Sequence, residues 1–176
     1  MKAFKAVFII LLVSTVIAIF WDSIPAIKDT VHIILDPITG KLLDYNINVG
    51  MIVISALITL FITIIQKYTI DNKTLAQLKK EQKIIAEDMK KLKDNPEKVM
   101  ELQKESLAKA GEIFTLSIKS FGYTAIPIIL FFRWFADYFA ALDPPVKIFG
   151  FFSWFWAYLI FSIIFSIIFR KMFKLP

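Results

Sequence analysis

Four long apolar segments constrain the fold of this chain more than any other feature. They lie at residues 6–21, 49–66, 120–136 and 148–169. A helix needs ~20 residues to cross the hydrocarbon core of a bilayer, or slightly fewer when anchoring side chains flank it. Because 57% of the 176 residues are hydrophobic and the mean hydropathy is +0.65, the sequence predicts an all-α integral membrane protein.

The first apolar segment has two interpretations. Lys2 and Lys5 precede a modest apolar core, as in a cleaved signal peptide. However, Ala18 is followed by the bulky residues Ile19, Phe20 and Trp21, which leaves no clear site of small residues for cleavage. The sequence therefore favours a retained signal anchor at residues 1–21.

The positions of the basic residues predict an orientation. Most of the 21 basic residues precede the first apolar segment, lie within 67–119 or follow the fourth segment. The remaining loops, 22–48 and 137–147, are net acidic. Lys and Arg concentrate on the cytosolic side of membrane proteins, so four crossings place both termini and segment 67–119 in the cytosol.

Segment 67–119 has the pattern of a helical hairpin. The first arm carries apolar and amide side chains at the alternating spacing of a coiled-coil seam: Leu75, Leu78, Gln82, Ile85, Met89 and Leu92. Asn95 and Pro96 suit the cap and first turn of a second helix. The apolar face expected on that helix is less regular and comprises Val99, Leu102, Leu107, Ala110 and Phe114. We expect a cytosolic antiparallel coiled coil whose Lys-rich exterior is either simply solvated or meets lipid headgroups or ribosomal RNA.

The segment from 22 to 48 resembles a helix that lies on the outer membrane surface. Apolar residues recur there at helical spacing: Ile24, Ile27, Val31, Ile34 and Leu35. His32 is the only histidine and has no second ligand at metal spacing, and the chain has no cysteine. We therefore expect no metal site, no cofactor and no disulfide.

Small polar residues form a stripe along three of the apolar segments. At ~100° per residue, those on the first stripe fall within roughly 80° of one another, and those on the second within roughly 60°. The candidate site residues are Ser55, Thr59, Thr63, Gln66, Ser117, Ser120, Thr124, Ser162 and Ser166. They either bond the helices to one another or line a hydrated recess entered from the cytosol, and the shared depth favours the recess.

Two further features are expected to mark the outer membrane interface. Arg133 lies close enough to this interface to extend into it beside Trp134, or to form an ion pair with Asp137. The aromatic cluster at 151–158 is typical of an interfacial belt.

The order of these elements resembles the archaeal YidC-like proteins. A polar-faced span after an outer amphipathic helix, a hairpin with "DNPE" at its tip and two further spans cover about residues 45–170. The resemblance implies a three-helix YidC-like core, with spans at 49–66, 120–136 and 148–169, in the superfamily of YidC, the Oxa insertases and core subunits of the endoplasmic-reticulum insertion complexes. The N-terminal signal-anchor helix and the hairpin complete the expected fold.

The resemblance also implies a function as a membrane protein insertase of the plasma membrane. Family members offer a hydrophilic groove to nascent membrane proteins, which implies that role for the polar residues of the first two core spans. Bacterial relatives place an Arg in the first core span and have five core spans, whereas 49–66 has no Arg and three spans are matched here. A partner subunit is therefore expected to complete the site, and the ribosome is a candidate partner of the hairpin.

Two other functions remain open from the sequence. An ion-conducting or transporting oligomer is expected to place ionisable residues near the middle of the membrane, and no pair of these occurs. A scaffold would recruit a cytosolic partner through the hairpin. No motif of a metalloprotease, serine hydrolase or phosphate-binding enzyme is present, so we do not expect an enzyme.

Overall fold

The structure is a computed structural model that describes residues 2–176, and it is all-helical. A 3-10 turn at Trp21–Ser23 and a π turn at Asp36–Gly40 join some of the helices. The α-helices of the described part are α1 (Lys2–Ile19), α2 (Pro25–Leu35), α3 (Lys41–Tyr45), α4 (Ile47–Thr69), α5 (Asn72–Lys91), α6 (Pro96–Ala140) and α7 (Trp154–Met172).

By length and composition, two or three of these helices can cross a membrane. α4 and α7 each meet this condition, with mean hydropathies of 2.4 and 1.6. α6 bends by 53° between Ile118 and Ser120, and its two parts together form a third candidate span. The apolar stretch of α1 at Val7–Ile19 is shorter. The protein is therefore an integral membrane protein with two to three candidate spans, whereas the sequence predicts four.

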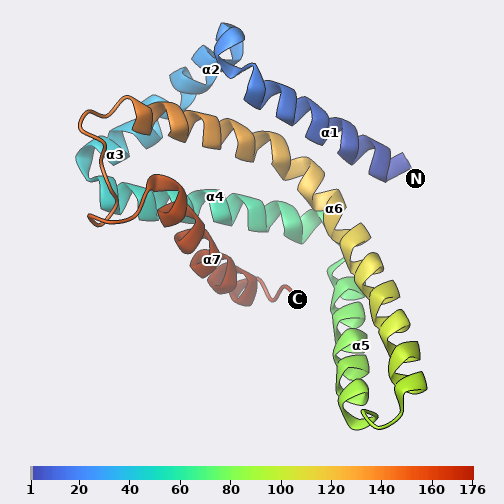
Figure 1. Cartoon of the computed structure of the whole chain (residues 1–176). Coiled ribbons are helices and arrows are strands. Elements are labelled where there is room, and N and C mark those ends of the chain that lie inside the picture. The colour runs from blue at the N-terminus through green and yellow to red at the C-terminus, as the bar shows by residue number, and fades with distance from the viewer. Residues whose placement is uncertain (1) are drawn as a thin grey trace.

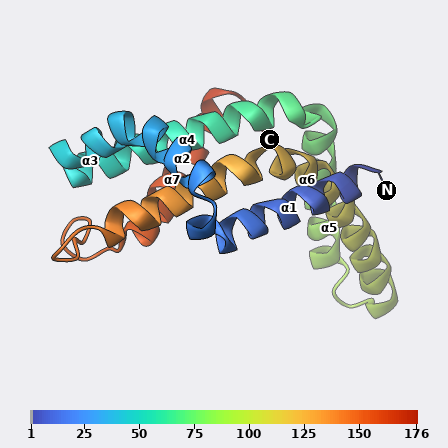
Figure 2. The ribbon, with the colours of Figure 1, turned by 90° about the horizontal axis from the view of Figure 1, so that it is seen from above.

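The helices form a bundle from which a helical hairpin projects (Figure 1). α6 lies between α1 and α4, and α2 crosses over it (Figure 2). α7 packs along α4, and α5 packs along the first part of α6. We call the end of the bundle that carries the hairpin the hairpin end. α2, α3 and residues 141–153 lie at the opposite end, which we call the far end.

The hydrophobic core lies mainly toward the far end. Trp134, Phe135, Met51 and Ile148 are completely buried there. The ring of Trp154 stacks on those of Phe135 and Phe139, with ring centroids 5.8 and 6.1 Å apart. Aromatic pairs in such contact add to the stability that burial provides.

The aromatic cluster at 151–158 is divided between this core and the surface. Trp154 packs on the core and Tyr158 is buried in it, with the Tyr158 ring edge-to-face against Phe132 at 5.1 Å. By contrast, Phe151 and Trp156 are exposed. The cluster is therefore not only an interfacial belt, because α7 needs these aromatic side chains to pack against α6.

Two glycines allow close contacts between helices. A Cβ atom on Gly50 would lie 2.8 Å from the backbone oxygen of Leu42, so α3 packs directly on the backbone of α4. A Cβ atom on Gly122 would lie 3.0 Å from Cγ2 of Val7, so α1 approaches α6 closely. The bend in α6 is nearer to Gly122 than to Pro127.

The hairpin buries one side of α5 against α6. Leu75, Leu78 and Ile85 are buried, and Lys109 Nζ lies 2.8 Å from a carboxylate oxygen of Glu81 on the other arm. The expected cap is confirmed, because the side chain of Asn95 accepts a hydrogen bond from the backbone N–H of Lys98 at 3.2 Å.

Part of the apolar face expected on the second arm is wrong. Leu107 and Phe114 are 68% and 60% exposed. At ~100° per residue, these two positions lie roughly 70–90° from the centre of the face formed by Val99, Leu102 and Ala110. Apolar identity alone suggested them, and the helical angle turns them away from α5.

A charge in the hairpin core should separate its arms. Replacing Ile85, 6% exposed, with Asp puts a carboxylate without a partner between the arms, which costs about 2 kcal/mol or more. Hydrogen exchange should rise in both arms and stay unchanged in α4 and α7. Ile84→Asp is the matched control, because Ile84 is 49% exposed. Faster exchange in α5 alone would contradict the pairing.

The close contact at Gly50 can be tested with alanine. Gly50→Ala forces α3 away from α4 and should lower the free energy of unfolding by about 1–3 kcal/mol. Gly111→Ala has no atom within 4 Å of the new methyl group and should be neutral or stabilising by about 0.5–1 kcal/mol. Thermal unfolding in detergent, followed by circular dichroism, measures both. A neutral Gly50→Ala would mean that the two helices are not in this contact.

Candidate functional site

The polar stripes of α4 and α6 face the interior of the bundle. Ser55, Thr59, Thr63, Ser120 and Thr124 are each 5% exposed or less. The candidate residues nearer the hairpin end or on α7 are half-buried: Gln66, Ser117, Ser162 and Ser166. The interior of the bundle thus changes from aromatic at the far end to small and polar toward the hairpin.

These hydroxyl groups do not bond the helices together. Thr63 Oγ1 donates to the backbone oxygen of Thr59 at 2.7 Å, and Ser117 Oγ donates to that of Ile113 at 2.8 Å. Thr124 and Ser162 likewise donate to backbone oxygens of their own helices. The hydroxyls of Ser55, Thr59 and Ser120 are buried and have no hydrogen-bond partner.

One polar contact does join two of the stripes. Arg170 Nη2 of α7 donates to Gln66 Oε1 of α4 at 2.7 Å. Arg170 Nε also lies 3.4 Å from Ser166 Oγ, one turn earlier on the same helix. The predicted site residues did not include Arg170. Its position one turn after the polar pair of α7 was the signal that could have identified it.

Two pockets open among these helices. The larger, of about 570 Å³, is lined in part by Gln66, Ser117, Ser120 and Thr124. The smaller, of about 440 Å³, is lined in part by Thr59, Ser162 and Ser166. Arg170 lines both, while Ser55 and Thr63 are among the residues lining neither. Seven of the nine predicted site residues therefore line two pockets, and Arg170 belongs to both pockets.

The larger pocket also contains a lysine from the hairpin. Lys79 of α5 lies on its lining, together with Arg170. Lys79 is an exposed residue, but desolvation of its ammonium group at the pocket lowers the pKa of that group, and the positive charge of Arg170 lowers it further. Two cations from different helices, α5 and α7, thus line the same pocket.

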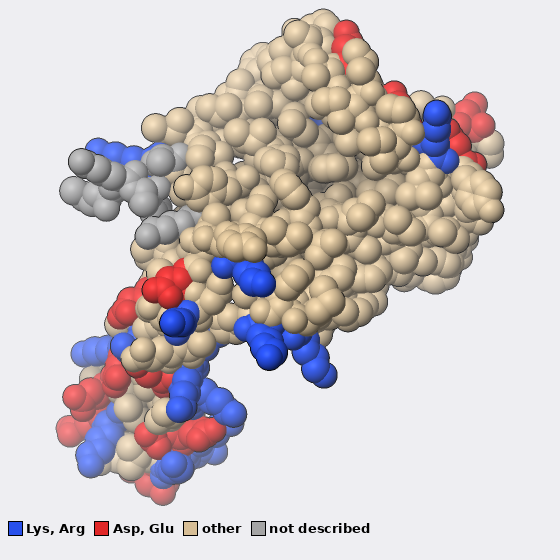
Figure 3. All heavy atoms as spheres, turned by 180° about the vertical axis from the view of Figure 1, so that it is seen from behind, with Lys and Arg blue, Asp and Glu red and all other residues tan. Residues whose placement is uncertain are grey.

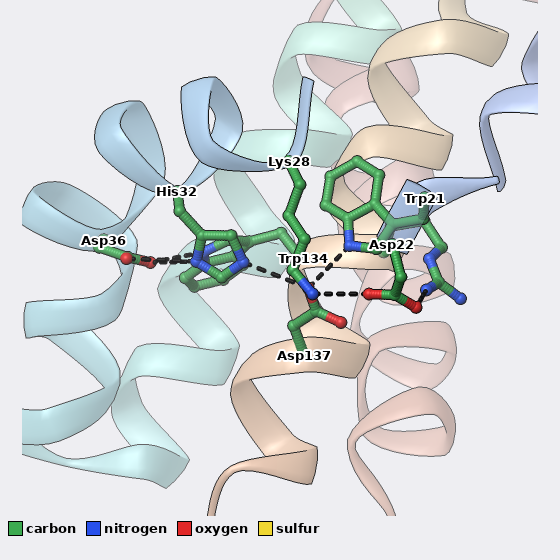
Figure 4. Close-up of polar contacts among 8 residues, drawn as sticks. Trp21, Asp22, Lys28, His32, Asp36, Trp134 and Asp137 are labelled. Carbon is green, nitrogen blue, oxygen red and sulfur yellow. Dashed lines mark hydrogen bonds and ion pairs between the residues drawn. The ribbon is translucent and has the colours of Figure 1, made fainter. Parts of the chain in front are cut away.

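A second polar cluster, at the far end, ties the 21–45 segment to α6 (Figure 4). Asp137 Oδ2 accepts a hydrogen bond from Trp21 Nε1 at 2.7 Å and lies 3.3 Å from both Lys28 Nζ and His32 Nε2. Trp134 Nε1 donates to Asp36 Oδ1 at 2.7 Å. Tyr138 OH also donates to Asp44 Oδ1 at 2.6 Å. We call these residues, with Asp22 and Arg133, the polar clamp.

The contacts of the polar clamp correct the ion-pair partner predicted for Arg133 and show a structural role for His32. Arg133 pairs with Asp22, at 3.5 Å between Nη2 and Oδ2, and not with Asp137. Its guanidinium also lies over the ring of Trp21 at 5.7 Å. His32 lies between Asp36 and Asp137, at 3.1 and 3.3 Å from their carboxylates. Within residues 2–176, no group of His, Asp and Glu side chains is arranged to hold a metal ion.

The comparisons with known proteins place most of the chain in one family. Residues 32–176 match the family described as "Integral membrane protein EMC3/TMCO1-like". The match includes all the predicted site residues, Arg170 and Lys79, and it excludes α1. No curated protein and no solved structure matches the chain.

Removing the charge of Asp137 should loosen the far end. Asp137→Asn leaves Lys28 and His32 without a partly buried carboxylate, which should lower the free energy of unfolding by about 1–3 kcal/mol. Hydrogen exchange of residues 21–36 should rise most. Asp29→Asn is the control, because Asp29 is exposed on α2. Equal free energies of unfolding of the two variants would mean that the contacts of Asp137 do not stabilise the fold.

Proposed function

The chain belongs to the EMC3/TMCO1-like family of integral membrane proteins, within the superfamily of the YidC and Oxa insertases, and we propose that it inserts other membrane proteins. Members of this family are components of insertases and chaperones and are not bond-making enzymes. The proposed clients are nascent membrane proteins. Their polar segments enter a hydrophilic groove between α4, α6 and α7, which is lined by the predicted site residues.

The unpaired hydroxyls of Ser55, Thr59 and Ser120 carry this proposal. A buried hydroxyl without a partner costs about 1–3 kcal/mol relative to one that is hydrogen-bonded. Side chains that served only to hold the helices together would bond across the helix interfaces. Groups left free inside the bundle can instead offer hydrogen bonds to a polar segment that enters.

The position of the polar residues supports a groove that opens at the hairpin end. Moving an unpaired peptide group into hydrocarbon costs several kcal/mol. A polar path through part of the bilayer lowers this barrier, because the segment then crosses the remaining apolar distance only. The aromatic core at the far end closes the path on the other side.

The charges support an orientation with the hairpin in the cytosol. Charged side chains gather on the hairpin and near the two ends of the bundle, while the region between them is almost free of charge on the face shown (Figure 3). In the proposed topology both termini are cytosolic, α1 is a retained anchor, and the protein resides in the plasma membrane. The basic hairpin is then available to a ribosome, and a partner subunit completes the groove.

Cysteine labelling tests whether the site contains water. The chain has no cysteine of its own, so each introduced thiol is the only one present. Ser120→Cys and Thr124→Cys should react with a water-soluble maleimide added from the hairpin side. Phe61→Cys should not react in a bilayer, because Phe61 is 47% exposed on an apolar span and faces lipid. Protected thiols at 120 and 124 would count against the groove.

A triple variant separates a groove from interhelical bonding. Ser55→Ala, Thr59→Val and Ser120→Ala together remove the unpaired hydroxyls and keep the side-chain volumes similar. Stability should stay equal or rise, because no hydrogen bond is lost. Insertion of a client with a polar translocated end should fall about fivefold or more, if one bond of ~1 kcal/mol to the client is lost.

The control for the triple variant is Thr15→Val. Thr15 is exposed on α1 and bonds only to its own helix, so insertion should not change. A triple variant that loses stability and keeps full insertion activity would contradict the groove. It would instead indicate that these hydroxyls bond the helices to one another.

A further inference from the structure

The larger pocket at the hairpin end contains two cations, Lys79 and Arg170, that form no ion pair with an Asp or Glu side chain among the described residues. The contacts of Arg170 are the Gln66 amide oxygen, the Ser166 hydroxyl and, at 3.2 Å from Nη1, the backbone oxygen of Pro176. Positive charges that face one space repel each other, and a bound anion would remove this repulsion.

A buried hydroxyl is available beside these cations. Ser120 lines the pocket, is 2% exposed, and has no hydrogen-bond partner for Oγ. Ser117 and Thr124 line the same pocket, but their hydroxyls already donate to backbone oxygens of α6. Ser120 thus places a hydroxyl without a hydrogen-bond partner at the wall of the pocket.

The rest of the pocket wall is apolar and comes from α1, α5, α6 and the end of α4. Phe114 and Phe121, on the α6 side, are 60% and 51% exposed, so the wall extends onto the outer surface of the bundle. The apolar lining residues are Leu11, Ile70, Leu75, Ile113, Phe114, Ile118 and Phe121. A ligand that fits this wall carries a hydrocarbon chain next to its negative charge.

We propose that this pocket binds an anionic phospholipid from the leaflet on the hairpin side. The phosphate group lies between Arg170 and Lys79 and accepts a hydrogen bond from Ser120. One acyl chain lies along the apolar wall formed by α1 and α6. The pocket volume of about 570 Å³ holds a headgroup and the first part of a chain.

A lipid fits the pocket better than an acidic peptide segment does. An acidic peptide held beside Lys79 and Arg170 brings backbone N–H and C=O groups that need partners, and the apolar residues of the wall there offer none. A phospholipid brings one compact anionic group and hydrocarbon. The proposal shares residues with the groove but does not depend on insertion activity, since lipid binding needs no client.

Lipid retention measured by native mass spectrometry tests this directly. The protein, with its purification tag after Pro176, is placed in nanodiscs of phosphatidylcholine that contain phosphatidylglycerol. Wild type should retain phosphatidylglycerol in preference to phosphatidylcholine. Lys79→Gln and Arg170→Gln should each weaken this binding, by about tenfold for the loss of a charge-assisted contact. The double variant should lose the preference.

Matched variants separate this site from general attraction to basic residues. Lys80→Gln and Lys171→Gln remove one charge each from the sequence neighbours of the two cations, which do not line the pocket, and should keep the lipid. Arg170→Lys keeps the charge and should largely preserve binding. Circular dichroism and elution as a single species confirm that each variant is folded. Equal retention of the two lipids by wild type, or unchanged retention by the double variant, would overturn the proposal.

Two competitors identify the source of the anion. Inorganic phosphate should not displace the lipid, because it lacks a chain for the apolar wall. A short peptide with Asp residues and apolar flanks should not displace it either. Displacement by phosphate would make this a free-phosphate site, and displacement by the peptide through Lys79 and Arg170 would make it a client site. Either result overturns the lipid proposal, and neither contradicts the proposed insertion activity, which is measured separately with a client protein.

Discussion

The hydrogen bonds and ion pairs of Asp137 determine how the far end of the bundle is assembled. One carboxylate joins Trp21, which follows α1, and Lys28 and His32 of α2 to the end of α6. The aromatic rings of α6 and α7 pack beside this contact. These interactions hold the helices together at one end, while toward the other end the interior side chains are too small to fill the same space. The two pockets follow from this difference in side-chain size.

The parts of the fold that depend on local periodicity could be predicted from the sequence. The spacing of Ser55, Thr59 and Thr63 predicts a single helical face, and the structure buries that face. The Asn95–Pro96 pair predicts a helix start because capping depends on adjacent residues only. The same reasoning failed at Leu107 and Phe114, where apolar character was given more weight than angular position.

The contacts between distant residues could not be predicted in this way. Arg170 and Gln66 are 104 residues apart, and Arg133 and Asp22 are 111 apart. Periodicity gives the direction of a side chain around its own helix but not the neighbouring helix that it meets. The ion pair that was predicted as one of two alternatives for Arg133 therefore named Asp137, which is near it in sequence, whereas its partner in the structure is Asp22, which follows α1. For the same reason, the sequence could not show that Lys79 and Arg170 line one pocket.

The helix α1 contributes to the bundle although it lies outside the family match. It packs closely on Gly122 of α6, and Leu11 lines the larger pocket. Trp21, which follows it, is 1% exposed and bonds to Asp137. A segment whose sequence resembles a signal peptide thus packs as a helix of the bundle in the structure.

The continuity of α6 gives the hairpin a mechanical connection to the interior. Helix α6 runs from Pro96 at the tip to Ala140 at the far end, with a bend of 53° between Ile118 and Ser120. The arm before the bend is about 30 Å long at 1.5 Å per residue. A body that docks on the tip and displaces it by about 3 Å would rotate this arm by roughly 6° about the bend. This rotation would act on the part of α6 that carries Ser120 and Thr124. Displacement of the hairpin tip would therefore change the distance between α6 and the neighbouring helices at the polar residues.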